Sequence, residues 1–178
     1  LTNGDVALRL PSQQLDNVLR DGRLKSQFET GRSAGGGINK DARAEAEENG
    51  LGIARNIDPA QRPIYAYVRH PFSEEYVEAY GDTTVVFKRD VRQSSTYTVG
   101  DSLDNMRRNQ VKGVALDQTD VEAWGSNVNR LYRMATVRTT PDAAGLDYVD
   151  VQIRGATVDK IAHVIDNDRK ILSSTLRQ

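Results

Sequence analysis

The amino-acid sequence, 178 residues long, predicts an α+β protein folded as one domain over residues 1–178. Two observations predict this class. Segments rich in β-branched and aromatic residues occur between residues 63 and 99 and again between 146 and 155. Apolar residues at helical spacing, or polar runs bounded by capping residues and glycines, occur at 11–22, 40–50 and 119–131. No long polar linker separates these segments, so a second domain is not expected.

Composition narrows the classes of function and partner. A formal charge of −1 gives no electrostatic case for nucleic acid or a membrane surface as a partner. Without cysteine the chain forms neither disulfides nor thiolate metal sites, and His70 and His163 lack metal-binding spacing, so we expect no metal. No apolar run is long enough to span a bilayer, and we expect a monomer. Because the chain begins at Leu1, we expect that a preceding segment has been removed.

The first 30 residues predict a helix followed by a strand. Within PSQQLDNVLRDG, Ser12 is expected to cap a helix whose apolar face carries Leu15, Val18 and Leu19, and Gly22 is expected to end it. In RLKSQFET, residues 23–30, apolar and small side chains alternate with larger polar ones, which predicts a short strand.

The strand is expected to break into the glycine-rich stretch GRSAGGG, residues 31–37. Such a stretch lets backbone approach a ligand, but it is also typical of a plain connecting loop, and it fits neither common phosphate-loop pattern. KDARAEAEENG, residues 40–50, then predicts a polar helix that ends at Asn49 and Gly50, with its charges on a solvated face.

The rest of the chain predicts four strands and one helix. PIYAYV (63–68), TTVVFK (83–88) and QSSTYTV (93–99) are the first three strands, with turns at 81–82 and 88–90, and the hydroxyl-rich third strand is typical of an exposed edge. A capping box at 119–122 predicts a helix whose apolar stripe, 121 to 131, packs in the core. The fourth strand lies within LDYVDVQIRG, residues 146–155.

That fourth strand supplies the sharpest functional candidates. Alternation directs Val149, Val151 and Ile153 to the core and places Asp150 and Gln152 together on the opposite face. A sheet holds such a pair rigidly, so the carboxylate can stabilise positive charge while the amide orients a partner. The same pair is also common on a plain solvated strand face, and spacing alone does not separate the two readings.

Three segments together resemble a bacterial family. In order, they are GRLKSQFETGRSAGG, RQSSTYTVGDS and YVDVQIRG. The family pattern is S-Q-F-E-T-G, then T-x-G-D-S, then an acidic strand motif. The layout is similar to that of mono-ADP-ribosyltransferases and nearest to the XopAI group of type III effectors from plant pathogens. The resemblance spans about residues 12 to 165, and SQFETG is its specific part. It implies a split β-sandwich, two mainly antiparallel sheets that form a cleft with flanking helices.

The resemblance also implies an activity and its residues. The chain would be a secreted bacterial effector or toxin that acts inside a host or target cell, moving ADP-ribose from NAD, its substrate, to a protein acceptor such as an arginine side chain. Asp150 and Gln152 would be catalytic. The NAD-binding positions would be Arg23, Lys25, Thr30, Arg32, Ser94, Ser95 and Thr96.

Two departures from the family pattern keep alternatives open. Lys25 cannot form the planar pair of hydrogen bonds that the usual arginine forms. The second position of the late pair, which is usually acidic, is occupied by the amide side chain of Gln152. A degenerate domain that binds an arginine-containing peptide in the same cleft is therefore the second hypothesis. A nuclease or RNA-modifying toxin, with His70, His163, Arg107 and Arg108 as its scattered support, is the third.

Overall fold

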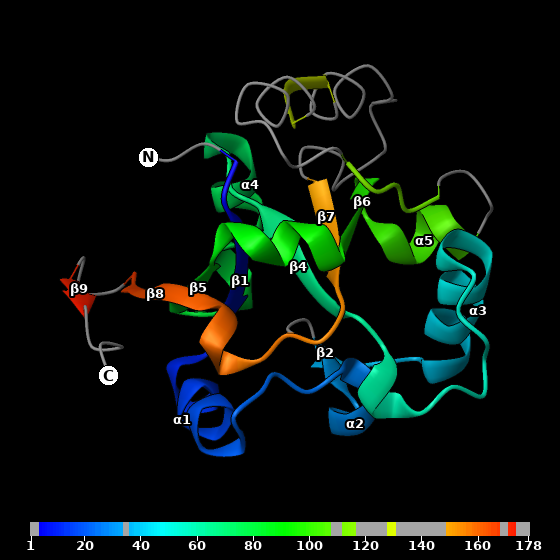
Figure 1. Ribbon diagram of the computed structural model, residues 1–178, viewed down its shortest axis with the longest axis horizontal. Helices are drawn as coiled ribbons and strands as arrows, with labels where there is room; N and C mark the ends of the chain where they lie inside the picture. The colour runs from blue at the N-terminus through cyan, green and yellow to red at the C-terminus, as the bar shows by residue number, and fades with distance from the viewer. Residues whose placement is uncertain are drawn as a thin grey trace.

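The computed structural model describes residues 4–33, 36–107, 112–116, 128–130, 149–167 and 171–173. It confirms the α+β class: seven strands form one antiparallel sheet in the order β6-β7-β4-β1-β5-β8-β9, and two more form a short hairpin (Figure 1). The strands are β1 Val6–Leu10, β2 Arg32–Ser33, β3 Gly36–Gly37, β4 Ile64–Val68, β5 Thr83–Phe87, β6 Ser95–Val99, β7 Val149–Ile153, β8 Ile161–Asp166 and β9 Ile171–Ser173. The α-helices are α1 Ser12–Asp21, α2 Gln27–Thr30, α3 Lys40–Leu51, α4 Pro71–Tyr76 and α5 Ser102–Arg107.

Strand β1 joins two halves of the large sheet. It pairs with β5 from Ala7 to Leu10 but with β4 only through Val6 and Ala7. Beyond Ala7 the remaining residues of β1 and β4 are not partners, so the sheet divides into a β6-β7-β4 half and a β1-β5-β8-β9 half. The two halves separate on the side of the molecule that carries α1 and α2 (Figure 1).

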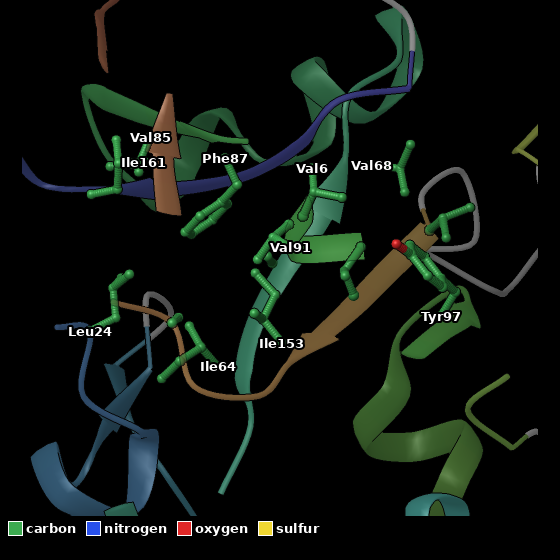
Figure 2. Packing of buried hydrophobic residues seen from close by; sticks show 14 of the residues in the cluster. Val6, Leu24, Ile64, Val68, Val85, Phe87, Val91, Tyr97, Ile153 and Ile161 are labelled. Carbon is green, nitrogen blue, oxygen red and sulfur yellow. The ribbon is translucent and has the colours of Figure 1, made fainter. Parts of the chain in front are cut away.

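The two faces of the sheet differ in chemistry. One face carries the main hydrophobic core, in which Val6, Ile64, Phe87 and Ile153 pack with Val91 from the 3-10 turn Arg89–Ser94 (Figure 2). The opposite face carries a cross-strand row that the register fixes as Thr98, Asp150, Tyr67, Ala7 and Val86. The alternation read from residues 149–153 is thereby confirmed, and Asp150 and Gln152 point away from the core.

Helix α1 follows the prediction except at its start and at Leu19. Pro11 is the N-cap, and Ser12 lies in the first turn, where its backbone N–H and hydroxyl both donate to the carboxylate of Asp82. The cap therefore comes from a residue 70 positions away, which local spacing does not reveal. Leu19 is exposed rather than packed, while Gly22 ends the helix in the left-handed conformation as predicted.

The strand predicted over residues 23–30 is wrong, because residues 27–30 form helix α2. Ser26 caps this helix by accepting from the backbone N–H of Glu29, and the Glu29 carboxylate accepts from the backbone N–H of Ser26. Gly31 ends the helix at a φ of 69°. The capping box S-x-x-E was present in SQFE, and two reciprocal hydrogen bonds outweigh the apparent alternation over a few residues. Part of the glycine-rich stretch that follows forms the β2–β3 hairpin.

Helix α3 extends one residue past the predicted segment, to Leu51, and Gly52 is its C-cap. Gly50 lies inside this helix. Glycine is favoured at this position because a Cβ would fall 2.4 Å from the Met106 side chain of α5. The charges of α3 were predicted to face solvent, but Glu47 is fully buried and Arg43 turns toward the sheet. This burial comes from tertiary packing, since α3 packs along α5 (Figure 1) and the Tyr65 side chain of β4 reaches Glu47.

The remaining strand predictions agree in type and differ in bounds. The strands predicted at 63–68 and 83–88 are confirmed, and the third begins at Ser95 because Gln93 and Ser94 still belong to the preceding 3-10 turn. The helix predicted from 119 to 131 lies outside the described residues except for 128–130. Within the described part of the chain, no helix has the length and apolar character needed to cross a membrane.

Candidate active site at the split of the sheet

A cavity of about 590 Å³ opens where β1 and β4 part. Residues 8–10 of β1 and 64–66 of β4 line it, and these are the parts of the two strands that lie outside their short pairing. Tyr67, which is paired with Ala7, also lines it. Helix α1, the 23–25 segment, α2 and Arg32 of the hairpin form another wall. The volume falls within the usual range for small-molecule sites.

Asp150 lies in the wall of this cavity and is 5% exposed. Its carboxylate accepts hydrogen bonds from both the hydroxyl and the backbone N–H of Ser102, the first residue of α5. Burial raises the pKa of Asp150 to about 7, with a further increase from Asp101, while Ser102 and the nearby Arg43 act in the opposite direction. A carboxylate near half-ionised at neutral pH is suited to acid–base chemistry.

Arg43 brings a positive charge to this carboxylate from α3. Its guanidinium stacks over the Tyr65 ring at 4.2 Å from the centroid and donates to Ser102 Oγ at 3.2 Å. Beneath the ring, the Tyr65 hydroxyl donates to Glu47 Oε1 at 3.0 Å, and Glu47 forms a buried ion pair with Arg62. Burial raises the pKa of Glu47, although Arg62 and Tyr65 oppose that change.

Arg9 is the cation that β1 contributes to the cavity. Its Nε donates to the carbonyl of Gly81 at 2.6 Å, and no carboxylate within the described ranges pairs with its guanidinium. Gly81 can lie this close to β1 because glycine has no Cβ, and a Cβ at this position would lie 2.2 Å from the backbone of Leu10. The guanidinium is thus held at the split with its terminal nitrogens available.

The cavity wall is strongly cationic although the whole chain has a net charge of −1. Among the residues that the structure describes, three carboxylates line it, those of Asp21, Asp101 and Asp150. The cationic side chains of the same described ranges that line it number six, namely Arg9, Arg20, Arg23, Lys25, Arg32 and Arg43. The surplus of positive charge favours an anionic ligand.

Four of the predicted binding residues line the cavity together with Asp150. Arg23 makes a two-pronged ion pair with Glu29, and Lys25 pairs with Asp21 at 2.7 Å. The Thr30 hydroxyl hydrogen-bonds to the backbone of α2 and β2. Arg32 is exposed, and its guanidinium makes no hydrogen bond or ion pair with the described part of the chain. Of these four, Arg32 alone keeps its charge free for a ligand.

The other predicted residues lie outside the cavity. The hydroxyls of Ser94 and Ser95 both donate to the carbonyl of Val91, where they close the 3-10 turn before β6. Gln152 is fully buried, with its Oε1 accepting from Thr96 and Thr98. Its Nε2 has no partner among the described residues. The structure therefore separates Gln152 and the hydroxyl strand from Asp150's cavity.

Sequence reasoning missed Arg9, Arg43, Tyr65 and Asp101. Arg9 had a usable signal: it is a charged residue in the otherwise apolar strand VALRL, whose alternation sets it on the face opposite the core. Arg43 had none, because it lies in a helix with charges on every side. Neither His70 nor His163 lines the cavity.

Compared with models of known protein families and with curated proteins, the sequence gives no significant match. Among the residues that the structure describes, no three His, Asp or Glu side chains gather to form a metal site.

Proposed function

We propose that this protein cleaves NAD and transfers its ADP-ribose to a macromolecular acceptor, with an arginine side chain as the candidate acceptor. The observation that carries the proposal is the placement of Asp150: a single buried carboxylate of β7 faces a cavity whose wall is otherwise mainly cationic. NAD requires this combination, because its pyrophosphate is anionic while its reacting ribose becomes positively charged.

The pyrophosphate would bind to Arg9 and Arg32. Both guanidinium groups lack a carboxylate partner in the described part of the chain, and both line the cavity. Planar guanidinium groups bind phosphate oxygens through paired hydrogen bonds, which a lysine cannot do. Arg9 thus takes the basic role that the sequence assigned to Arg23 or Lys25, both of which already have carboxylate partners.

Asp150 would act on the nicotinamide ribose. As the bond between C1′ and the nicotinamide nitrogen breaks, its electron pair leaves with nicotinamide and positive charge develops on the sugar. A carboxylate beside that carbon lowers the barrier electrostatically, as in glycoside hydrolysis. The acceptor nitrogen then bonds to C1′ and releases its proton to solvent. Gln152 has no part in these steps because it lies outside the cavity.

The division of the large sheet supports an ADP-ribosyltransferase-like split β-sandwich. The limited pairing between β1 and β4 gives two strand groups with the cavity between their diverging residues. The role as a secreted bacterial effector or toxin, delivered by type III secretion into a host or target cell, rests on the sequence resemblance alone.

A second candidate is a degenerate domain that holds an arginine-containing peptide in the same cavity. Two observations favour it: Asp101 and Asp150 both line the cavity and lie close enough to interact electrostatically, and the amide of Gln152 stands where the resemblance expects a second acid. This domain would bind a guanidinium between Asp101 and Asp150 and leave NAD intact.

NAD binding, measured by titration calorimetry, tests the proposal. Replacing Arg9 (Arg9→Gln) should weaken NAD binding about 10- to 100-fold, because a charge-assisted contact to phosphate is lost. Arg154→Gln is the matched control, since Arg154 is exposed and lies outside the cavity. If the wild-type protein fails to bind NAD at millimolar concentration, or binds it equally well without Arg9, the NAD site proposed here is wrong.

A further inference from the structure

A continuous chain of contacts connects the buried ion pair under α2 to Asp150. It begins at Phe28, whose ring lies 3.7 Å from the guanidinium of Arg62. It continues through Glu47 and the Tyr65 hydroxyl to the Tyr65 ring, which supports Arg43. Arg43 then contacts Ser102, and Ser102 donates to Asp150. Every step is a hydrogen bond, ion pair or ring contact between specific groups.

We propose that Arg43 is the positioning residue of this site: supported on Tyr65, it fixes Ser102 against Asp150 and stabilises the charged form of the carboxylate. This role is additional to the proposed transferase function and refines its site. Arg43 acts through Ser102 and through its charge, and the face of its guanidinium is covered by the Tyr65 ring.

The geometry explains why a cation is needed here. Asp150 has few solvent contacts, and a buried carboxylate with only Ser102 as donor would stay protonated at neutral pH. The other groups that interact electrostatically with it oppose its ionisation or are neutral. Those groups are Asp101 before α5, Tyr65 on β4 and Tyr76 on α4, and Tyr67 lies opposite Asp150 in the strand register. Within the described residues, Arg43 is the cation whose charge lowers the pKa of Asp150 most.

Tyr65 contacts Arg43 through its ring, while its hydroxyl separately donates to Glu47. An aromatic ring restricts the orientation of a planar guanidinium stacked on it more than it would restrict a lysine ammonium group. The ring face and the hydroxyl can therefore be tested separately. Tyr65→Leu removes the ring, whereas Tyr65→Phe keeps the ring and removes only the hydroxyl.

The experiment is a carboxyl-carbon NMR titration of Asp150 in the ligand-free protein, assigned with Asp150→Asn. We expect the wild-type midpoint at about pH 7. Arg43→Gln should raise the midpoint by about one pH unit or more, a tenfold loss of ionisation. Arg43→Lys and Tyr65→Leu should raise it by a smaller amount, and Tyr65→Phe should leave it nearly unchanged.

Arg55→Gln is the matched charge control, because Arg55 carries the same charge but is exposed and pairs with Glu48. It should leave the Asp150 midpoint in place. If folded Arg43→Gln titrates like wild type, or if Arg55→Gln shifts the midpoint as much, the inference is wrong. Should Arg43→Gln not fold, Arg43→Lys and Tyr65→Leu decide the question. The titration uses no NAD, so it can succeed or fail independently of the proposed function.

Discussion

Glu47 and Arg62 form an ion pair that is buried on both sides, with side-chain exposures of 1% and 2%. The pair is also hydrogen-bonded to Tyr65 and to the carbonyl of Arg55, so most of its polar atoms are satisfied. Arg62 Nε is an exception and has no partner within the described residues. A pair of this kind contributes little net stability when intact, but losing one member leaves a buried, unpaired charge.

Replacing Glu47 with glutamine should therefore destabilise the protein by about 3–5 kcal/mol, because Arg62 would keep its charge without a counter-ion. Urea denaturation measures this change. Glu48→Gln on the same helix is the control: the Glu48–Arg55 pair is about half exposed, so its loss should cost at most about 1 kcal/mol. Equal effects of the two substitutions would show that the buried pair is not structurally important.

Asp150 illustrates what could be read from sequence at the scale of single residues. Its strand and its face followed from alternation alone, and the structure agrees with both, whereas Gln152 shares that face without lining the cavity. Its partners did not follow, because Ser102 and Arg43 come from separate helices. Alternation specifies which way a side chain points, but contacts across the chain depend on how helices pack.

Helix α2 is the element that most changes the interpretation of the sequence. The SQFET stretch appears at first to be a strand on the floor of a cleft, yet its residues build a capped turn. Ser26 caps it and also donates to the carbonyl of Pro59 at 2.7 Å, while Phe28 covers Arg62. The most specific part of the resemblance is thus explained by structure: SQFETG supports the buried ion pair, and only Gln27 and Thr30 of α2 reach the cavity.

Ser26→Ala should destabilise the protein by about 1–2 kcal/mol, because both the cap and the bond to Pro59 are lost. Thermal unfolding measures the change. Ser33→Ala is a suitable control, since Ser33 is only half-buried and its hydroxyl makes a long 3.4 Å contact within its own hairpin. If Ser26→Ala unfolds at the wild-type temperature, the capping box does not contribute to the stability of this segment.

For the whole molecule, periodicity predicted β4, β5, β6 and β7, but it missed β1, β8 and β9 and did not reveal how the strands are joined. The division depends on where β1 changes partner, at Ala7, and nothing in VALRL marks that residue. The cavity follows from this division and from the closeness of Gly81 to Leu10, which leaves Arg9 facing the split. A glycine in a turn before a strand is too common to predict such a contact.

The whole account depends on one chemical claim, that ionised Asp150 promotes cleavage of NAD in this cavity. Because the pKa of Asp150 is raised to about 7, the charged form is lost as the pH falls below that value. Activity that requires the carboxylate should decrease about tenfold per pH unit on the acid side and level off above neutrality.

The most direct measurement is the rate of nicotinamide release from NAD between pH 5.5 and 8.5, for the wild-type protein and for Asp150→Asn. We expect release that rises through about pH 7 in the wild type and is at least about 100-fold slower in the variant, whose amide cannot supply the charge. Release at the same rate in Asp150→Asn, or none above background in the wild type, would contradict the account.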